Sequence, residues 1–317
     1  MSAGADLRAL PGLRRRSALE QALGPAVAAA LSAPDVTEAL INADGALWLD
    51  RAGSGLSDTG IRLTPGDREA AIRLIAHEAG QTAGPDRPLL SAILPESGAR
   101  VQAALPPVVA APVLAIRKRA EFRVTLGDYV AAGIAAPEQA RALADAVEAG
   151  RNIVVAGGAG SGKTTLLNAL MAEPAFLAAR LIVLEDTAEL QVPGPNCVQL
   201  LTHVSDPEIT LRDLVRAALR MRPGRIIVGE VRSGAALDVL KAWNTGHSGG
   251  LLTLHANSAA DALARLEDLC LEAAPLVPAR LIRSAVDMIV FITRTPGLPG
   301  RRITEILDLR ALEGDLT

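Results

Sequence analysis

The chain has 317 residues, half of them hydrophobic, and a formal net charge of −3 at pH 7. This length and apolar content exclude a mainly disordered chain and suggest one large domain or two of ordinary size. The acidic balance and an aromatic content of only 2% argue against a protein that attracts and stacks on nucleic acid, so we expect no stable direct nucleic-acid binding.

The two cysteines, Cys197 and Cys270, are far apart and fit no metal-ligand spacing, so we expect reduced core thiols. The longest apolar run, residues 101–116, contains three prolines and makes a poor membrane-spanning helix. No N-terminal stretch has the pattern of a signal peptide. The sequence therefore predicts a soluble, cytoplasmic protein whose contact with the inner membrane is at most peripheral.

The first third of the chain predicts a small α+β domain. An Asp-Gly turn between two short apolar runs is typical of a β-hairpin, and Thr64 before Pro65 is typical of a helix start. The expected elements are helices at residues 7–31 and 64–79 and strands at residues 36–41, 46–50, 89–94 and 100–105.

Three prolines between residues 106 and 112 precede a basic cluster at residues 116–119. Such punctuation is typical of a domain boundary. We therefore expect an N-terminal α+β domain over residues 1–112, a linker over residues 113–123 and a second domain over residues 124–317. The basic cluster is either a solvated surface or a set of contacts that reach phosphates.

The second domain alternates short apolar runs with helical patterns, which is typical of an α/β fold with a mainly parallel sheet covered on both faces. The expected strands are residues 151–156, 181–184, 226–228 and 251–254. The expected helices are residues 126–132, 137–149, 164–171, 211–221, 235–242 and 259–271.

Residues Gly157–Thr164 match the P-loop pattern of Gly, four residues, Gly, Lys and Ser or Thr, between an expected strand and an expected helix. The glycines let successive backbone N–H groups turn toward an anion, and the helix adds a partial positive charge. Lys163 can bridge the β- and γ-phosphate oxygens of ATP, and the Thr164 hydroxyl can ligate Mg²⁺. The expected nucleotide-binding residues are Gly157, Gly158, Ala159, Gly160, Ser161, Gly162, Lys163, Thr164 and Thr165.

Carboxylates follow two of the expected strands. Glu185 and Asp186 can hold Mg²⁺ or orient the attacking water, with a solvated acidic loop as the alternative. Glu230 follows an apolar run in the Walker B arrangement, where a glutamate near the γ-phosphate can polarise water for in-line attack. We expect Glu230 to act as the base and Glu185 to act through Mg²⁺, so that the expected metal ligands are Thr164, Glu185 and Asp186.

His247 and His255 flank a Gly-rich turn and an expected strand. His255 ends that strand at the sheet edge expected for Glu230, which makes it a candidate for sensing the γ-phosphate. His77 and His203 have no such setting and are expected to be surface or packing residues. The catalytic candidates are therefore Lys163, Glu185, Glu230 and His255.

Four blocks of the sequence resemble the Walker A, Asp box, Walker B and His box of the secretion-ATPase superfamily. They are residues Gly157–Thr164, Leu184–Leu190, Arg220–Arg232 and Thr245–Ser258. Within the type IV secretion branch, the chain is most similar to the TrbB-type conjugal-transfer ATPases, through Ala120–Gly133 and Leu240–His247. Ala159, Gly224 and Ser248 depart from the family's usual Thr, Asp and Pro, but none of these changes removes a group that the chemistry needs.

The resemblance implies a Mg²⁺-dependent P-loop NTP hydrolase with a RecA-like domain that binds ATP and assembles as a homo-hexamer. Its partners would be inner-membrane components of a secretion or conjugation channel. Hydrolysis between the two domains would move one against the other and drive substrate export or pilus assembly. Arg117 at the linker would reach the phosphates, and Arg100, Arg123, Arg222 and Arg232 are further candidates for this role.

Three alternatives remain open at this stage. The first is a type II secretion or type IV pilus ATPase, although such proteins often carry a four-cysteine zinc insertion and this chain has two cysteines. The second is a nucleic-acid translocase, which the acidic charge and scarce aromatic residues disfavour. The third is a nucleotide-sensing scaffold without turnover, which the intact Lys163, Thr164 and Glu230 disfavour.

Overall fold

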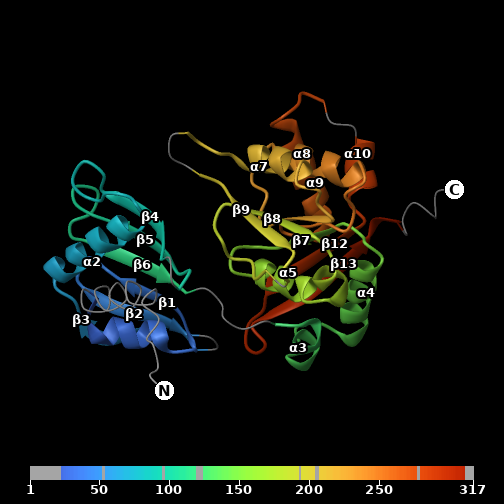
Figure 1. Cartoon of the computed structure of the whole chain (residues 1–317). Helices are drawn as coiled ribbons and strands as arrows, with labels where there is room; N and C mark the ends of the chain where they lie inside the picture. The colour runs from blue at the N-terminus through green and yellow to red at the C-terminus, as the bar shows by residue number, and fades with distance from the viewer. Residues whose placement is uncertain are drawn as a thin grey trace, which may run out of the picture. The chain divides into compact units, whose positions relative to one another are not determined.

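The computed structural model describes residues 23–51, 54–94, 97–118, 124–192, 194–203, 207–276 and 279–310. The chain divides into two compact units, Met1–Glu121 and Phe122–Thr317 (Figure 1). Each unit has its own sheet and its own hydrophobic core.

The first unit is built on a six-stranded antiparallel sheet with the strand order β3-β2-β1-β6-β5-β4. Two helices pack apolar side chains such as Val27 and Ile72 against residues of the sheet such as Ile116. Thr64 caps the second helix by accepting from the backbone N–H of Asp67, as expected. The elements are residues 23–32 (helical), β1 (Val36–Ile41), β2 (Ala46–Arg51), β3 (Gly55–Arg62), α2 (Pro65–Glu78), β4 (Leu89–Ile93), β5 (Arg100–Ala104) and β6 (Val113–Arg117).

The structure corrects the expected linker. Strand β6 occupies residues 113–117 and pairs with both β1 and β5 in the interior of the first sheet. Leu114 and Ile116 are buried in the core of this unit, so the first part of the expected linker belongs to the fold of the first unit. The remainder of that linker, residues 119–123, lies outside the described residues, as do residues 7–22 of the expected first helix.

The second unit has an α/β architecture around a seven-stranded sheet with the strand order β13-β12-β7-β11-β10-β8-β9. All neighbouring strands are parallel except β12 and β13, which form an antiparallel hairpin. The expected mainly parallel sheet is therefore confirmed. The strands are β7 (Ile153–Ala156), β8 (Leu181–Glu185), β9 (Cys197–Leu201), β10 (Arg225–Val228), β11 (Leu251–Leu254), β12 (Met288–Arg294) and β13 (Arg301–Asp308).

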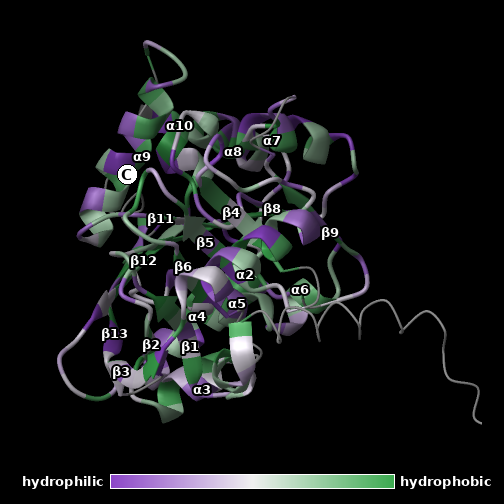
Figure 2. Ribbon diagram, turned by 90° about the vertical axis from the view of Figure 1, so that its left-hand side faces the viewer, coloured by the Kyte–Doolittle hydropathy of each residue, from purple (hydrophilic) through white to green (hydrophobic). Residues whose placement is uncertain are grey.

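Helices cover both faces of this sheet (Figure 1). Successive residues of β7 point to opposite faces of the sheet and so contribute to two hydrophobic cores. Val154 and Ala156 pack in the core that includes α7–α10, whereas Ile153 and Val155 pack in the core that includes α3–α6. Helix α9 shows both hydrophobic and hydrophilic segments, as a helix with one buried side does (Figure 2). The helices are α3 (Leu126–Ala131), α4 (Pro137–Glu148), α5 (Lys163–Met171), α6 (Pro174–Leu177), α7 (Leu211–Leu219), α8 (Ala235–Asn244), α9 (Ala259–Leu271) and α10 (Ala279–Ala285).

Several elements differ from the sequence-based expectations. Strands β3, β6, β9, β12 and β13 and helices α6 and α10 were not among the expected elements. Strand β3 is exposed along nearly its whole length and lacks the alternation that marks a half-buried strand. No helix in the described part of the chain combines the length and the apolar composition needed to cross a bilayer.

Replacing Gly250 by alanine is expected to destabilise the second unit. A Cβ atom at this position would lie 2.0 Å from Nε1 of Trp243 and 2.7 Å from the carbonyl oxygen of Ile226. That oxygen accepts the indole N–H of Trp243 at 3.3 Å, so neither neighbour can move without losing a buried contact. We expect the free energy of unfolding, measured by denaturant titration, to fall by about 3 kcal/mol.

The matched control is Gly158→Ala, because a Cβ atom at Gly158 meets nothing within 4 Å. This variant should have the same midpoint of denaturant-induced unfolding as the unmodified chain. Equal stability of Gly250→Ala and the unmodified chain would contradict the packing of Trp243 described here.

Candidate functional site

The loop between β7 and α5 contains the expected phosphate-binding residues. Gly160 and Gly162 have φ angles of 65° and 101°, in the left-handed region that glycine adopts without strain. When residues in the left-handed region alternate with residues in the right-handed region, neighbouring backbone N–H groups point to the same side. These N–H groups then form a concave site for an anion. Gly157 is required for close approach, because a Cβ atom there would lie 2.2 Å from the carbonyl oxygen of Ile292.

Lys163 is the first residue of α5, and only 7% of it is exposed. Its Nζ atom donates to the carbonyl oxygens of Gly157 at 3.0 Å and Gly158 at 2.9 Å. Burial lowers the pKa of the Lys163 amine, while the charge of Glu230 acts in the opposite direction. The amine therefore lies over its own loop, where phosphate oxygens can take the place of the two carbonyl acceptors.

The hydroxyl groups of the loop offer a test of whether an anion fits here. The Ser161 Oγ atom is buried and, among the described residues, has no hydrogen-bond partner. A buried hydroxyl of this kind usually marks a place that a water or a ligand fills. Thr164 and Thr165 follow Lys163 in the first turn of α5 and are half-buried. The loop therefore has the donors that a phosphate group requires.

Glu230 and His255 come together at the ends of two neighbouring parallel strands, β10 and β11. The Nε2 atom of His255 lies 2.8 Å from Oε1 of Glu230, and Nδ1 of His255 lies 3.4 Å from Nζ of Lys163. Arg232 donates to Oε2 of Glu230 at 2.6 Å. The structure thus brings Lys163, Glu230 and His255 into one cluster, at the sheet edge that the sequence analysis expected, and adds Arg232 to it.

The two oxygens of Glu230 differ in their surroundings. Oε2 is held by Arg232, whereas the buried Oε1 has Nε2 of His255 2.8 Å away but receives no hydrogen bond of acceptable geometry among the described residues. The backbone behind it is fixed, because the Thr253 hydroxyl donates to the carbonyl oxygen of Gly229 at 2.6 Å. Oε1 is therefore available to accept a proton from a bound water.

The pKa of His255 lies below its ordinary value, first because the ring is partly buried and then because the positive charge of Lys163 is near. The ring is therefore neutral at neutral pH, and it gains a proton only as the pH falls below about 6.5. The folded chain then binds fewer protons than the unfolded chain in this window, so His255 lowers the stability as the pH falls.

Removing the charge of Lys163 should raise the pKa of His255. We expect an NMR titration of the His255 ring to give a midpoint below about 6.5 in the unmodified chain and a higher midpoint in Lys163→Met. Lys241→Met removes a lysine outside the cluster and serves as the control. A His255 midpoint that does not respond to Lys163→Met would contradict the proximity of the two groups.

Glu185 ends β8 at the expected sheet edge, but its carboxylate is occupied by other groups of the protein. Its carboxylate is buried, and Oε1 accepts from the backbone N–H groups of Glu189 and Leu190, both at 2.9 Å. The side-chain amide of Gln199 donates to Oε2, and Gly229 leaves room because a Cβ atom there would lie 2.8 Å from Cγ of Glu185. These contacts give Glu185 a positioning role, since it fixes the loop after β8 and ties β8 to β9, while its role toward Mg²⁺ stays a prediction.

The remaining acidic candidate, Asp186, is exposed and accepts from the Thr202 hydroxyl at 3.1 Å. The hydrogen bond to Glu230 raises the pKa of the Arg232 guanidinium, and the charge of Asp186 adds to this effect. Among the described residues, no group of three or more His, Cys, Asp or Glu side chains is arranged to hold a metal ion. A metal ion at this site would therefore need the oxygens of a bound phosphate chain as further ligands.

The arginines expected to contact phosphates have different settings. Arg117 and Arg100 are cross-strand neighbours in the first unit, and Nε of Arg117 lies 3.5 Å from Oε1 of Glu38. Their role toward a nucleotide stays a prediction. Arg222 is exposed, with a left-handed φ of 53°, and Arg232 contacts Glu230. Arg123 lies outside the described residues.

The sequence analysis missed two arginines that lie against the loop. Arg294 of β12 donates from Nε to the carbonyl oxygen of Gly160 at 3.2 Å. Arg301 of β13 lies beside Gly162, where a Cβ atom would be 2.7 Å from its NH1 atom. No local motif marks these residues, because their relation to the loop comes from the pairing of β12 with β7.

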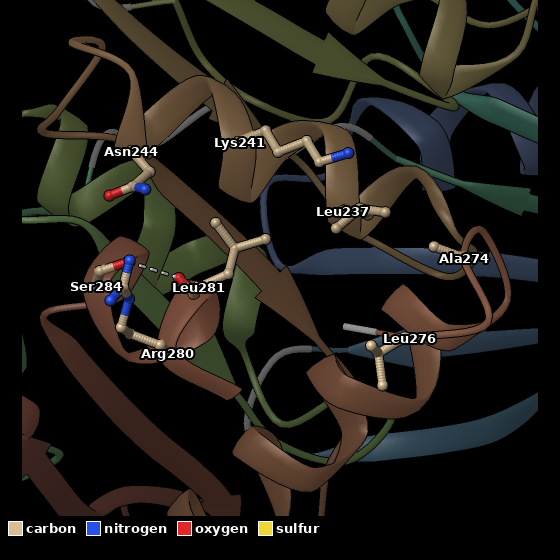
Figure 3. Close-up of a pocket in the computed structure, with 8 residues that line it drawn as sticks. All are labelled: Leu237, Lys241, Asn244, Ala274, Leu276, Arg280, Leu281 and Ser284. Atoms are coloured by element: carbon tan, nitrogen blue, oxygen red, sulfur yellow. Dashed lines mark hydrogen bonds between the residues drawn. The ribbon is translucent and has the colours of Figure 1, made fainter. Parts of the chain in front are cut away.

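A pocket of about 310 Å³ lies elsewhere in the second unit, on α8, α10 and two residues that follow α9 (Figure 3). It carries two cationic side chains and no carboxylate. The phosphate-binding loop, Glu230 and His255 do not line this pocket. The lining residues are Leu237, Lys241, Asn244, Ala274, Leu276, Arg280, Leu281 and Ser284.

Comparisons with known proteins agree over most of the chain. Residues 75–296 match the family described as "Type II/IV secretion system protein". The chain is 44% identical over 306 residues to the conjugal transfer protein TrbB of Rhizobium radiobacter, a match that covers 96% of this chain and 92% of that protein. It is 37% identical to the type IV secretion system protein PtlH of Bordetella pertussis, with 86% and 89% covered.

Among solved structures, one similar protein is the VirB11 ATPase of the Brucella suis type IV secretion system, crystallised in complex with sulphate. The two chains are 31% identical, with a TM-score of 0.50, and the match covers 96% of this chain and 98% of the other.

Proposed function

Because the chain belongs to the type II/IV secretion system protein family, we propose that it is the ATP-hydrolysing motor of a type IV secretion or conjugal-transfer system. The family match confirms the resemblance drawn from the four sequence blocks. The observation that carries the proposal is the convergence of Lys163, His255 and Glu230 at one sheet edge beside the glycine-rich loop.

ATP suits this loop for reasons that lie in its own atoms. The N–H groups around Gly160 and Gly162 and the amine of Lys163 supply donors to phosphate oxygens. Thr164 and Asp186 are the side chains that would hold Mg²⁺ together with the phosphates, which suits an ion that usually takes one or two protein ligands beside its phosphates. When bound, Mg²⁺ would neutralise part of the phosphate charge.

Glu230 is the general base in this proposal. Its Oε1 atom accepts a proton from a water whose oxygen attacks the γ-phosphorus, while the bond from that phosphorus to the β–γ bridging oxygen breaks. The products are ADP and inorganic phosphate. Arg232 holds the other carboxylate oxygen and so keeps Oε1 in place, and Lys163 balances the charge of the transferred group.

The proposal extends to assembly and location. A homo-hexameric ring in the cytoplasm, peripheral at the inner membrane and bound to the membrane components of a secretion channel, accords with a family of secretion-system proteins. Contacts of Arg117 or Arg100 with the phosphates, and coupling of hydrolysis to movement within the protein, belong to the same proposal. TrbB and PtlH as relatives favour type IV secretion over the type II secretion and pilus alternatives.

The test of the proposed activity is release of inorganic phosphate from ATP by the purified chain. We expect release with Mg²⁺ and none when EDTA removes the metal. Light scattering with a non-hydrolysable ATP analogue should give a particle of six times the chain mass. A chain that neither binds ATP nor releases phosphate under these conditions would refute the proposed function.

A further inference from the structure

The hairpin of β12 and β13 places two guanidinium groups on the phosphate-binding loop. Arg294 donates from Nε to the Gly160 carbonyl, and its NH2 atom lies 2.9 Å from the position of a Cβ atom at Gly160. Arg301 lies equally close to Gly162. These two glycines are the left-handed residues whose conformations turn the loop N–H groups toward one side. The two arginines therefore lie in contact with the two residues that shape the anion site.

The register of the hairpin makes this arrangement costly in the absence of an anion. Arg294 and Arg301 are directly opposite each other in the β12–β13 pairing, and like charges in such a pair destabilise a sheet. The preceding pair on the same face, Ile292 and Ile303, is buried in the core beneath α5. The two guanidinium groups thus extend the face of the sheet that carries the loop and α5.

The surroundings of the pair add further positive charge. The amine of Lys163 and the N-terminal end of α5, which carries a partial positive charge, belong to the same loop. In the described part of the chain, neither Arg294 nor Arg301 forms an ion pair with a carboxylate. Arg301 acts on the hydroxyl of Tyr129, which is buried and neutral because burial raises its pKa.

We propose that Arg294 and Arg301 bind the phosphate chain of the nucleotide from the side of the β12–β13 hairpin. This inference rests on the proposed nucleotide site at the loop and names two of its binding residues. An anion that lies between the guanidinium groups relieves their mutual repulsion, and the planar fork of an arginine matches the geometry of a phosphate group. The second unit then supplies its own arginine contacts, in addition to any that Arg117 or Arg100 makes.

The experiment measures the equilibrium affinity of the full chain for ADP and for inorganic tripolyphosphate, which has the phosphate chain without a base or a ribose. We expect Arg294→Ala and Arg301→Ala each to lower the affinity for both ligands on the order of tenfold. This is the usual contribution of one charge-assisted hydrogen bond. The double variant should lose more affinity than either single variant, and its remaining affinity should depend less on salt concentration.

Arg302→Ala is the matched control. Arg302 pairs with Thr293 and, by the alternation of a strand, points to the opposite face of the hairpin. The Arg302→Ala variant should bind both ligands with the affinity of the unmodified chain. Arg294→Gln and Arg301→Gln keep a donor for the loop but remove the charge, so they should bind as weakly as the alanine variants, and thermal unfolding verifies that each variant is folded.

Three results would overturn the inference: unchanged ADP affinity in both alanine variants, full recovery of affinity in the glutamine variants, or weakened ADP with unchanged tripolyphosphate. The last would place the arginines on the base or the ribose. The inference and the proposed function fail in different ways. If the unmodified chain binds no ADP, the proposed function fails; if only Lys163→Ala loses ADP while the arginine variants keep it, the inference alone fails.

Discussion

Glu230→Gln is expected to reduce ATP turnover by roughly 10²–10⁴-fold, the usual contribution of a general base, and to leave ATP affinity nearly unchanged. The amide keeps the size of the side chain, and its oxygen can still accept from Arg232, so the site retains its shape. It cannot take the proton of the attacking water. Steady-state phosphate release and equilibrium ATP binding, measured on the same preparation, give the two quantities.

Glu267→Gln provides the control for this prediction, because Glu267 is an exposed glutamate of α9 in the same unit. Its turnover should equal that of the unmodified chain. If Glu230→Gln turns over at the normal rate, another group removes the proton. If its rate falls only because ATP affinity falls, Glu230 acts in binding and the assignment of a base is wrong.

Lys163→Ala is expected to lose ATP binding and turnover together. Lys163 is the one cation within the loop itself, and its amine is buried against the carbonyl oxygens that a phosphate would displace. Without the charge-assisted bonds of Lys163 to two phosphate groups, the affinity of the chain for ATP should fall on the order of 100-fold. Titration with a fluorescent ATP analogue measures the affinity.

The control is Lys241→Ala, which removes an exposed lysine that lines the pocket on α8 (Figure 3). It should bind ATP normally. Tight ATP binding by Lys163→Ala would contradict the assignment of the loop as the phosphate site, whatever its rate of hydrolysis.

The parts of the site that the sequence revealed are those set by short motifs and by parallel strands. Lys163 and His255 are 92 residues apart, yet both follow strands of one parallel sheet, whose carboxyl ends meet at one edge. The motif fixes the conformation of the loop through its glycines, and the apolar runs fix the strands. Their combination was sufficient to predict that Lys163, Glu230 and His255 meet.

The role of Glu185 could not be read in the same way. Its position after a buried strand is that of a metal ligand, and its residue type fits. The donors that occupy its oxygens come from the turn at Glu189 and Leu190 and from Gln199 of β9, an unexpected strand of half-buried residues. A side chain whose partners depend on how a loop turns back carries no periodic signal.

Strand order explains the two hairpin arginines. Arg294 is 134 residues from Gly160, and it reaches the loop only because β12 pairs with β7 rather than with a strand closer in sequence. The continuous apolar run of β12 could have predicted a buried strand, but not its neighbour. Similarly, the prolines before β6 suggested a boundary, although tertiary pairing with β1 and β5 places that segment inside the first sheet.

The most direct test of the hydrolysis site is a single-turnover measurement, with the chain in excess over γ-labelled ATP at saturating Mg²⁺. The unmodified chain, Glu230→Gln and Glu185→Gln are compared for release of labelled phosphate. We predict that Glu230→Gln holds bound ATP without cleaving it, while folded Glu185→Gln cleaves ATP at nearly the normal rate. Normal cleavage by Glu230→Gln, together with a Glu185→Gln chain that binds ATP and is inert, would contradict the account.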